Sequence, residues 1–201
     1  MEVGDSEFTV RYMHFLFTHF PVDLDADCAY RADNAQWVEA NQTEVGARRE
    51  TICVLRSARQ IIEKLRQLEV YDNSTIVIKS DHGKKATYYG SEPQNLGFSG
   101  SSEWGYDRYR PLLMIKPAGR EADGMAMTDR PAAISDLAAT LCAAGPTKRR
   151  CGDYPGVDLM SPTGTDEPPV RIFVPKSANS THRFEDLKPV ELERGTDLRE
   201  L

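Results

Sequence analysis

Two potential metal ligands stand side by side in residues 80–83, Ser-Asp-His-Gly. They follow directly on an apolar, β-branched run, residues 74–79, which is typical of a buried strand. Open α/β sheets bind their ligands at the carboxyl ends of the strands, where Asp81 and His82 would lie. A carboxylate oxygen and an imidazole nitrogen both suit a divalent metal, and Gly83 allows a sharp turn behind them. The motif therefore predicts a metal site, and a plain polar turn is the simpler alternative.

The composition is that of an ordinary soluble globular protein. The chain has 201 residues, of which 40% are hydrophobic and 28% charged. Its net charge of −6 argues against a nucleic-acid partner. No apolar run approaches the roughly 18 residues of a membrane span. The sequence does not begin with the basic residues and apolar stretch that would indicate a signal peptide.

Four cysteines leave the redox state of the chain open. Cys142 and Cys151 are close enough in sequence for a local disulfide, and Cys28 and Cys53 are candidates for a second one. Four free thiols are the alternative. The acidic stretch 22–34 could bind a cation, but a solvated loop explains it more simply.

The hydrophobic pattern predicts strands that alternate with helices. Residues 8–18 are aromatic and β-branched, which favours a buried strand. Apolar residues recur at helical spacing over residues 43–68, and residues 74–80 form the next predicted strand. Because a strand–helix–strand crossover joins parallel strands, we expect an α/β fold with a mostly parallel sheet and helices on both of its faces.

The second half of the chain continues this pattern. The glycine-rich stretch 84–108 begins directly after the Asp-His pair, so we expect a loop that covers the site. Residues 111–117 predict a strand, and residues 132–144 predict a helix that a threonine and a proline introduce. Residues 171–174 predict a last strand, followed by a charged, peripheral tail over residues 177–201.

Several segments, taken together and in order, resemble the alkaline phosphatase superfamily, in particular its sulfatases and its phosphoglycerol and phosphoethanolamine transferases. Residues 71–83, Tyr-Asp-Asn-Ser-Thr-Ile-Val-Ile-Lys-Ser-Asp-His-Gly, resemble a metal-binding segment of that superfamily. Residues 108–119 resemble the strand that follows it, and residues 134–141 a later helix, with alanine at the usual proline position. Residues 156–159 are similar to its Gly-x-Asp-Leu segment, and residues 17–21 to its His-x-Pro segment.

The resemblance implies a fold, a chemistry and a set of site residues. The fold would be a three-layer α/β/α sandwich, with a partial sulfatase-like domain over residues 1–160 and a peripheral strand and tail over residues 161–201. Asp81 and His82 would bind a divalent metal, with zinc, manganese, calcium and magnesium not distinguished. His19 would contact a sulfate or phosphate group; the alternative is a histidine bonded to backbone. Lys84 could attract an anionic substrate through its charge, or could be a solvated turn lysine.

The resemblance also has departures. No residue matches the nucleophile of the superfamily, and residues 84–110 contain no histidine, unlike the corresponding stretch of most sulfatases. We therefore expect a C-terminal half of a metal-dependent hydrolase or transferase, acting on sulfate or phosphate esters that are small or linked to glycans or lipids. The parent protein could be membrane-anchored, and the resemblance suggests an extracytoplasmic location. A non-catalytic structural or interaction remnant of the same fold is the alternative.

Overall fold

The computed structural model describes residues 9–83, 106–119, 124–145, 151, 153–154, 156–162, 164, 167–176 and 184–197. These residues fall into two compact units, which divide between Asn73 and Ser74. We call them the N-terminal unit and the C-terminal unit, and each is described by itself.

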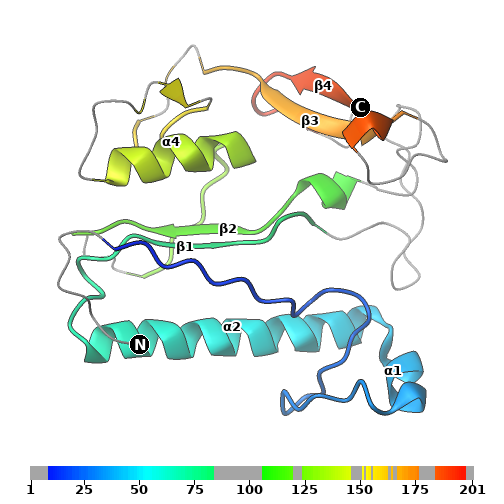
Figure 1. Ribbon diagram of the computed structural model, residues 1–201. Coiled ribbons are helices and arrows are strands. Elements are labelled where there is room, and N and C mark those ends of the chain that lie inside the picture. Colours follow the sequence, from blue (N-terminus) through cyan, green and yellow to red (C-terminus); the bar gives the residue numbers. More distant parts are fainter. Residues whose placement is uncertain are drawn as a thin grey trace. The chain divides into compact units, whose positions relative to one another are not determined.

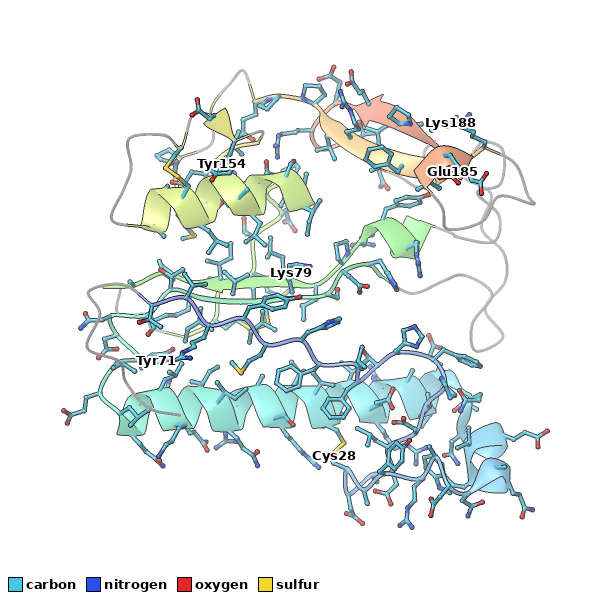
Figure 2. All side chains as sticks on the ribbon, in the orientation of Figure 1. Cys28, Tyr71, Lys79, Tyr154, Glu185 and Lys188 are labelled. Carbon is cyan, nitrogen blue, oxygen red and sulfur yellow. A yellow bond between two sulfur atoms is a disulfide. The ribbon has the colours of Figure 1, made fainter. Side chains whose placement is uncertain are left out.

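The N-terminal unit is built on one long helix, shown in cyan in Figure 1. Helix α2 spans Glu44–Gln67, which confirms the helix predicted over residues 43–68. It begins at Thr43, whose hydroxyl accepts a hydrogen bond from the Gly46 N–H at 3.1 Å. The short helix α1, Ala35–Asn41, precedes it. At the carboxyl end of α2, the Arg66 guanidinium lies 4.5 Å from the ring centroid of Tyr71, which Figure 2 labels.

Both disulfides considered from the sequence are formed. Cys28 is bonded to Cys53 of α2 across a sequence separation of 25 residues. Cys142 is bonded to Cys151 across a separation of 9 residues. The first bond fastens the acidic stretch 22–34 to α2, and Val22 and Leu24 of this stretch are buried at 0% and 5% exposure. The stretch is therefore a docked segment with its own small core.

Replacing Cys28 and Cys53 together by serine should lower the free energy of unfolding of the N-terminal unit by about 3 kcal/mol, because the bond restricts the unfolded chain. Cys142→Ser with Cys151→Ser is the matched control and should cost less, since its loop is shorter. Hydrogen exchange of backbone amides in denaturant measures the free energy of unfolding of each unit separately. A greater loss in the control pair would contradict the loop-length argument.

In its described part, the C-terminal unit contains two pairs of antiparallel strands and the helix α4, as Figure 1 shows. Strand β1, Ile76–Lys79, pairs antiparallel with β2, Leu113–Lys116, with Ile76 opposite Lys116. Strand β3, Val170–Pro175, pairs antiparallel with β4, Leu187–Leu192. Helix α4 spans Ile134–Ala144. One-turn 3-10 helices, η2 at Tyr106–Tyr109 and η4 at Phe184–Asp186, precede β2 and β4.

The expected α/β/α sandwich with a mostly parallel sheet is wrong for this structure. Both sheets in the described part of the chain have two strands, and both pairs are antiparallel. The parallel arrangement depended on a strand over residues 8–18, but described residues 9–16 belong to no strand. That stretch has extended character, since Phe15 and Phe17 stack at 6.0 Å between ring centroids. An apolar, β-branched pattern indicates a preference for extended backbone. It does not show whether a partner strand is available to form a sheet.

Helix α4 begins two residues later than its sequence signals indicate. The expected opening at residues 128–131 forms a turn, in which the Thr128 hydroxyl accepts from the Arg130 N–H at 3.1 Å. The helix is instead capped from within, because the Asp136 carboxylate accepts from the Ala133 N–H at 2.7 Å. The predicted strands over residues 74–80, 111–117 and 171–174 are confirmed, with β4 as an additional strand. None of the described helices is long and apolar enough to cross a membrane.

Candidate metal-binding site at the end of strand β1

The backbone on both sides of the Asp81-His82 pair is fixed by hydrogen bonds to the chain around β2. The Ser80 N–H donates to the Leu112 carbonyl at 3.1 Å, and the Leu112 N–H donates to the Ser80 hydroxyl at 2.8 Å. The Gly83 N–H donates to the Arg108 carbonyl at 2.9 Å. The two candidate ligands thus occupy a short turn with both ends anchored, directly after Lys79, which Figure 2 labels.

Within this turn, the imidazole of His82 is oriented by its own backbone. Its Nδ1 lies 2.8 Å from the Gly83 carbonyl oxygen. Because a carbonyl oxygen can only accept, Nδ1 carries the hydrogen, and the neutral ring then has its lone pair on Nε2. A hydrogen bond of this kind fixes the tautomer of metal-binding histidines.

The two ligand atoms converge. Asp81 Oδ2 lies 3.5 Å from His82 Nε2, while Asp81 Oδ1 accepts from the His82 N–H at 3.0 Å. With zinc bonds of about 2.0–2.2 Å, two ligands of one tetrahedral ion stand roughly 3.4 Å apart. Both side chains are accessible, with exposures of 77% for Asp81 and 42% for His82. The pair therefore has the spacing and the access that a shared divalent ion requires.

The described structure does not place the remaining predicted site residues relative to this pair. His19 belongs to the N-terminal unit and is exposed in a turn, where its Nδ1 lies 2.7 Å from the Phe20 carbonyl oxygen. Its Nε2 is thereby left available in the same tautomer as in His82. Lys84 and most of the covering loop expected over residues 84–108 lie outside the described residues, which resume at Tyr106. Among the described residues, no three His, Cys, Asp or Glu side chains form a group that could hold a metal.

Tyr109 is not a candidate base or nucleophile beside the turn. Burial raises the pKa of Tyr109 to about 12, although the nearby Arg108 charge opposes the shift. Its phenol therefore stays neutral throughout the ordinary pH range. Tyr109 therefore does not supply a base at this site.

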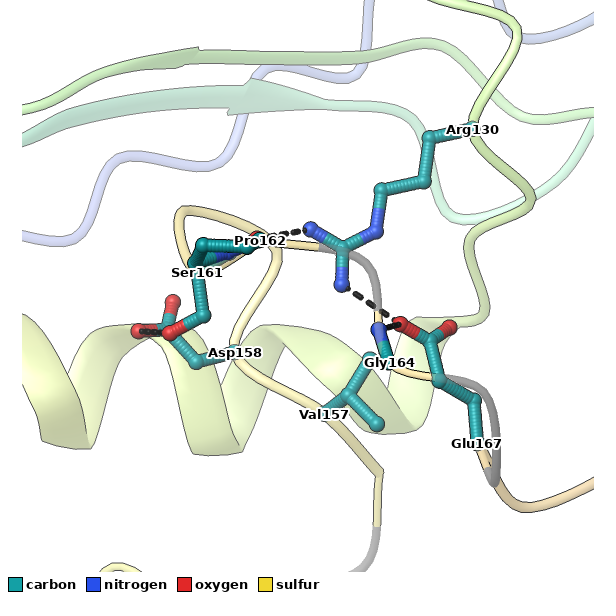
Figure 3. Close-up of a pocket in the computed structure, with 7 residues that line it drawn as sticks. All are labelled: Arg130, Val157, Asp158, Ser161, Pro162, Gly164 and Glu167. Carbon is teal, nitrogen blue, oxygen red and sulfur yellow. Dashed lines mark hydrogen bonds and ion pairs between the residues drawn. The ribbon is translucent and has the colours of Figure 1, made fainter.

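A pocket of about 440 Å³ lies elsewhere in the C-terminal unit, in front of α4 in Figure 3. Its arginine, Arg130, donates to Glu167 Oε1 at 2.8 Å and to the carbonyls of Leu159 and Ser161 at 2.8 and 2.6 Å. The charge of Arg130 is thus already matched by a carboxylate that is itself nearly buried. The pocket is a structural junction between α4 and the chain after it, with little to offer an anionic ester. Its lining residues are Arg130, Val157, Asp158, Ser161, Pro162, Gly164 and Glu167.

Sequence reasoning missed the residues that hold the turn. The backbone partners at Leu112 and Arg108 leave no mark in the side-chain pattern, since any non-proline residue carries the same N–H and C=O groups.

Comparison with protein-family models, with curated proteins and with solved structures found no match to this chain.

Proposed function

We propose that this chain contributes Asp81 and His82 as ligands to a divalent-metal site that acts on sulfate or phosphate esters. The observation that carries the proposal is the 3.5 Å approach of Asp81 Oδ2 to His82 Nε2 in an anchored, accessible turn. The resemblance of residues 71–83 to a superfamily metal-binding segment supports the same assignment.

The chemistry follows from the charge of the ester. A divalent ion would withdraw electron density from a sulfate or phosphate oxygen and activate a nucleophile, which attacks sulfur or phosphorus. Asp81 would offset part of the metal charge, and the Nδ1 hydrogen bond of His82 would keep its Nε2 on the ion. Two protein ligands are fewer than the three of a usual catalytic site, so further ligands are needed. His19 and Lys84 remain the proposed contacts to the anionic group.

Metal binding by the full chain should depend on both residues of the pair. We expect calorimetric titration with zinc, manganese, calcium and magnesium to detect one weak site for at least one of these ions. Asp81→Ala and His82→Ala should each weaken its affinity by at least about tenfold, because each removes one of few ligands. His14→Ala is the matched control, since it removes an exposed histidine in the other unit and should leave the affinity unchanged.

The alternative, a structural or interaction module without catalysis, makes a different prediction. In that case none of the four metals binds at the pair, or the affinity is the same in the wild type and in both alanine variants. Chromogenic sulfate and phosphate esters with added metal then test the chemistry. Since no nucleophile is assigned, we expect only background turnover from the chain alone. Robust turnover that Asp81→Ala abolishes would place the nucleophile within these residues and support the metal role.

A further inference from the structure

Glu50 is a buried acid with a half-satisfied carboxyl group. It lies in the first half of α2 and is only 1% exposed. Its Oε1 accepts a hydrogen bond from the Asp23 N–H at 3.0 Å. Its Oε2 is buried and has no hydrogen-bond partner in the described part of the chain. A buried carboxylate with one bare oxygen is costly, whereas a protonated carboxyl is tolerated far better.

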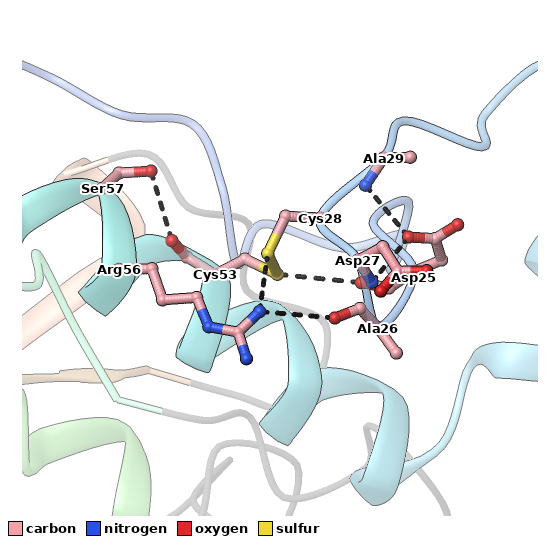
Figure 4. The surroundings of a disulfide bond; sticks show 8 residues. All are labelled: Asp25, Ala26, Asp27, Cys28, Ala29, Cys53, Arg56 and Ser57. Atoms are coloured by element: carbon pink, nitrogen blue, oxygen red, sulfur yellow. Dashed lines mark hydrogen bonds between the residues drawn. A yellow bond between two sulfur atoms is a disulfide. The ribbon is translucent and has the colours of Figure 1, made fainter. Parts of the chain in front are cut away.

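Glu50 supports one end of a segment that is otherwise held by neutral contacts. The Gln42 side chain pairs with both backbone groups of Val22, accepting from its N–H at 2.8 Å and donating to its carbonyl at 3.0 Å. Val22 and Leu24 are buried beside these bonds. Further along the chain, the Cys28–Cys53 disulfide bonds the loop after this segment to α2, as Figure 4 shows. We call residues 22–24 the buried segment.

Among the described residues, the charged groups around Glu50 do not compensate the charge of its carboxylate. In the stretch that contacts α2, Asp23 adds negative charge near Glu50. The Asp25 carboxylate accepts hydrogen bonds from the Arg31 guanidinium at 2.7 Å and from the Ala29 and Asp27 N–H groups. On α2, Arg49 donates to the neutral Asn41 of α1.

Farther along α2, Arg56 donates to the Ala26 carbonyl and to Cys28 Sγ, and Figure 4 shows it directed toward this loop. No ion pair of Glu50 exists among the described residues. Burial raises the pKa of Glu50, and the Asp23 carboxylate adds to the rise, which the Asp23 and Leu24 N–H groups oppose.

We propose that Glu50 is a proton-operated latch, which holds the buried segment on α2 while the Glu50 carboxyl is protonated and releases this segment on ionisation. Protonation removes the uncompensated charge and the repulsion by Asp23, and it lets the carboxyl keep its bond to the Asp23 N–H. Ionisation places a negative charge against Asp23, in a site where no cation of the described residues forms an ion pair with it. Loosening of the segment then brings water to Oε2, which lowers the cost of that charge.

The direction of the pH effect follows from linkage. A carboxyl whose pKa is higher in the docked state than in the open state binds more protons when docked. The stabilisation is complete below the ordinary glutamate pKa and is lost as the pH rises through the higher, docked value. Since one proton is involved, the docking equilibrium should fall by up to about tenfold per pH unit across that range.

Hydrogen exchange of the oxidised full chain tests the latch. Protection of the Asp23 and Leu24 amides, corrected for the intrinsic pH dependence of exchange, should fall as the pH rises from about 4 to about 8. In Glu50→Gln, which keeps the shape and the acceptor atom without the charge, protection should stay constant over this range. Asp23→Asn should show a smaller fall than the wild type, because one source of repulsion is gone.

Glu63→Gln is the matched control, since it changes a half-exposed acid on the same helix. Its profile at Asp23 and Leu24 should follow the wild type, and amides in β3 and β4 should show no such fall in any variant. A flat wild-type profile would overturn the proposal even if Glu50→Gln fails to fold. A profile of equal slope in the wild type and in Glu50→Gln would also overturn it.

Discussion

Replacing Arg194 by methionine should destabilise the C-terminal unit by about 3–5 kcal/mol, the loss expected when one partner of a buried ion pair is removed. The Arg194 guanidinium donates to both Asp136 oxygens, at 2.9 and 2.6 Å. The Asp136 side chain is fully buried, and the Arg194 side chain is 9% exposed. Methionine fills most of the volume of arginine but leaves the Asp136 charge unpaired.

Arg171→Met is the matched control for this prediction. Arg171 of β3 pairs with Glu191 of β4, but both side chains are more than half exposed. An exposed pair contributes about 0–1 kcal/mol, so the control should stay close to the wild type. Equilibrium unfolding in urea measures both variants. Equal losses in the two variants would show that burial of the Arg194–Asp136 pair has no special weight.

The same pair predicts an acid-sensitive C-terminal unit. Burial opposes ionisation of Asp136, but hydrogen bonds from Arg194 and from the Ala133 and Val157 N–H groups outweigh it, so its pKa is lowered. A lowered folded-state pKa contributes stability above the unfolded value, and this stability is lost as the pH falls through the folded value. The direction is opposite to that expected for Glu50 in the N-terminal unit.

Gly156→Ala should cost about 2–5 kcal/mol, the second large effect that we expect, from backbone strain and overpacking together. Gly156 has φ of +98°, and a Cβ built on it would lie 2.6 Å from Asp136 Oδ1 and 2.8 Å from the Asp136 nitrogen. The next residue, Val157, donates its N–H to Asp136 Oδ1 at 2.9 Å. The chain can therefore approach the start of α4 only where a side chain is missing.

Gly119→Ala separates strain from packing. Gly119 has φ of +68°, and no described residue lies within 4 Å of its added Cβ, so we expect only the backbone strain of about 1–2 kcal/mol. Thermal unfolding should rank Gly156→Ala well below Gly119→Ala in melting temperature. Similar melting temperatures for the two variants would mean that the chain after Gly156 moves away from α4 at little cost.

Local pattern predicted most of the described helices and strands, but not how the strands pair. Helix α2 and the strands β1 to β3 have the periodicity or β-branched composition of their class. Strand β4 was missed because Lys188, Pro189 and Glu191 make its sequence read as a charged tail. Its pairing with β3 puts several of these side chains at the surface, where charge is tolerated. Strand direction depends on which segments meet, and no local pattern contains that information.

The residues of the candidate site were predictable from local sequence, whereas the buried charged residues were not. Asp81 and His82 were predictable because they are neighbours in sequence and follow a recognisable strand. The importance of Glu50, Asp136 and Arg194 was not predictable, because each of them interacts with a residue at least 27 positions away. A lone acid in a helix gives the same pattern whether it is solvated or buried. Its environment exists only after the chain has folded.

The tie between Asp136 and Arg194 has a consequence for the order of events during synthesis. The two residues are 58 positions apart, and Asp136 is buried at the start of α4. When synthesis has reached only the end of α4, Arg194 has not yet been made, so the Asp136 carboxylate lacks its cation. Helix α4 therefore cannot yet pack as it does in the folded unit. The C-terminal unit must therefore complete its fold late, once residue 194 has left the ribosome, and earlier intermediates must keep Asp136 in water.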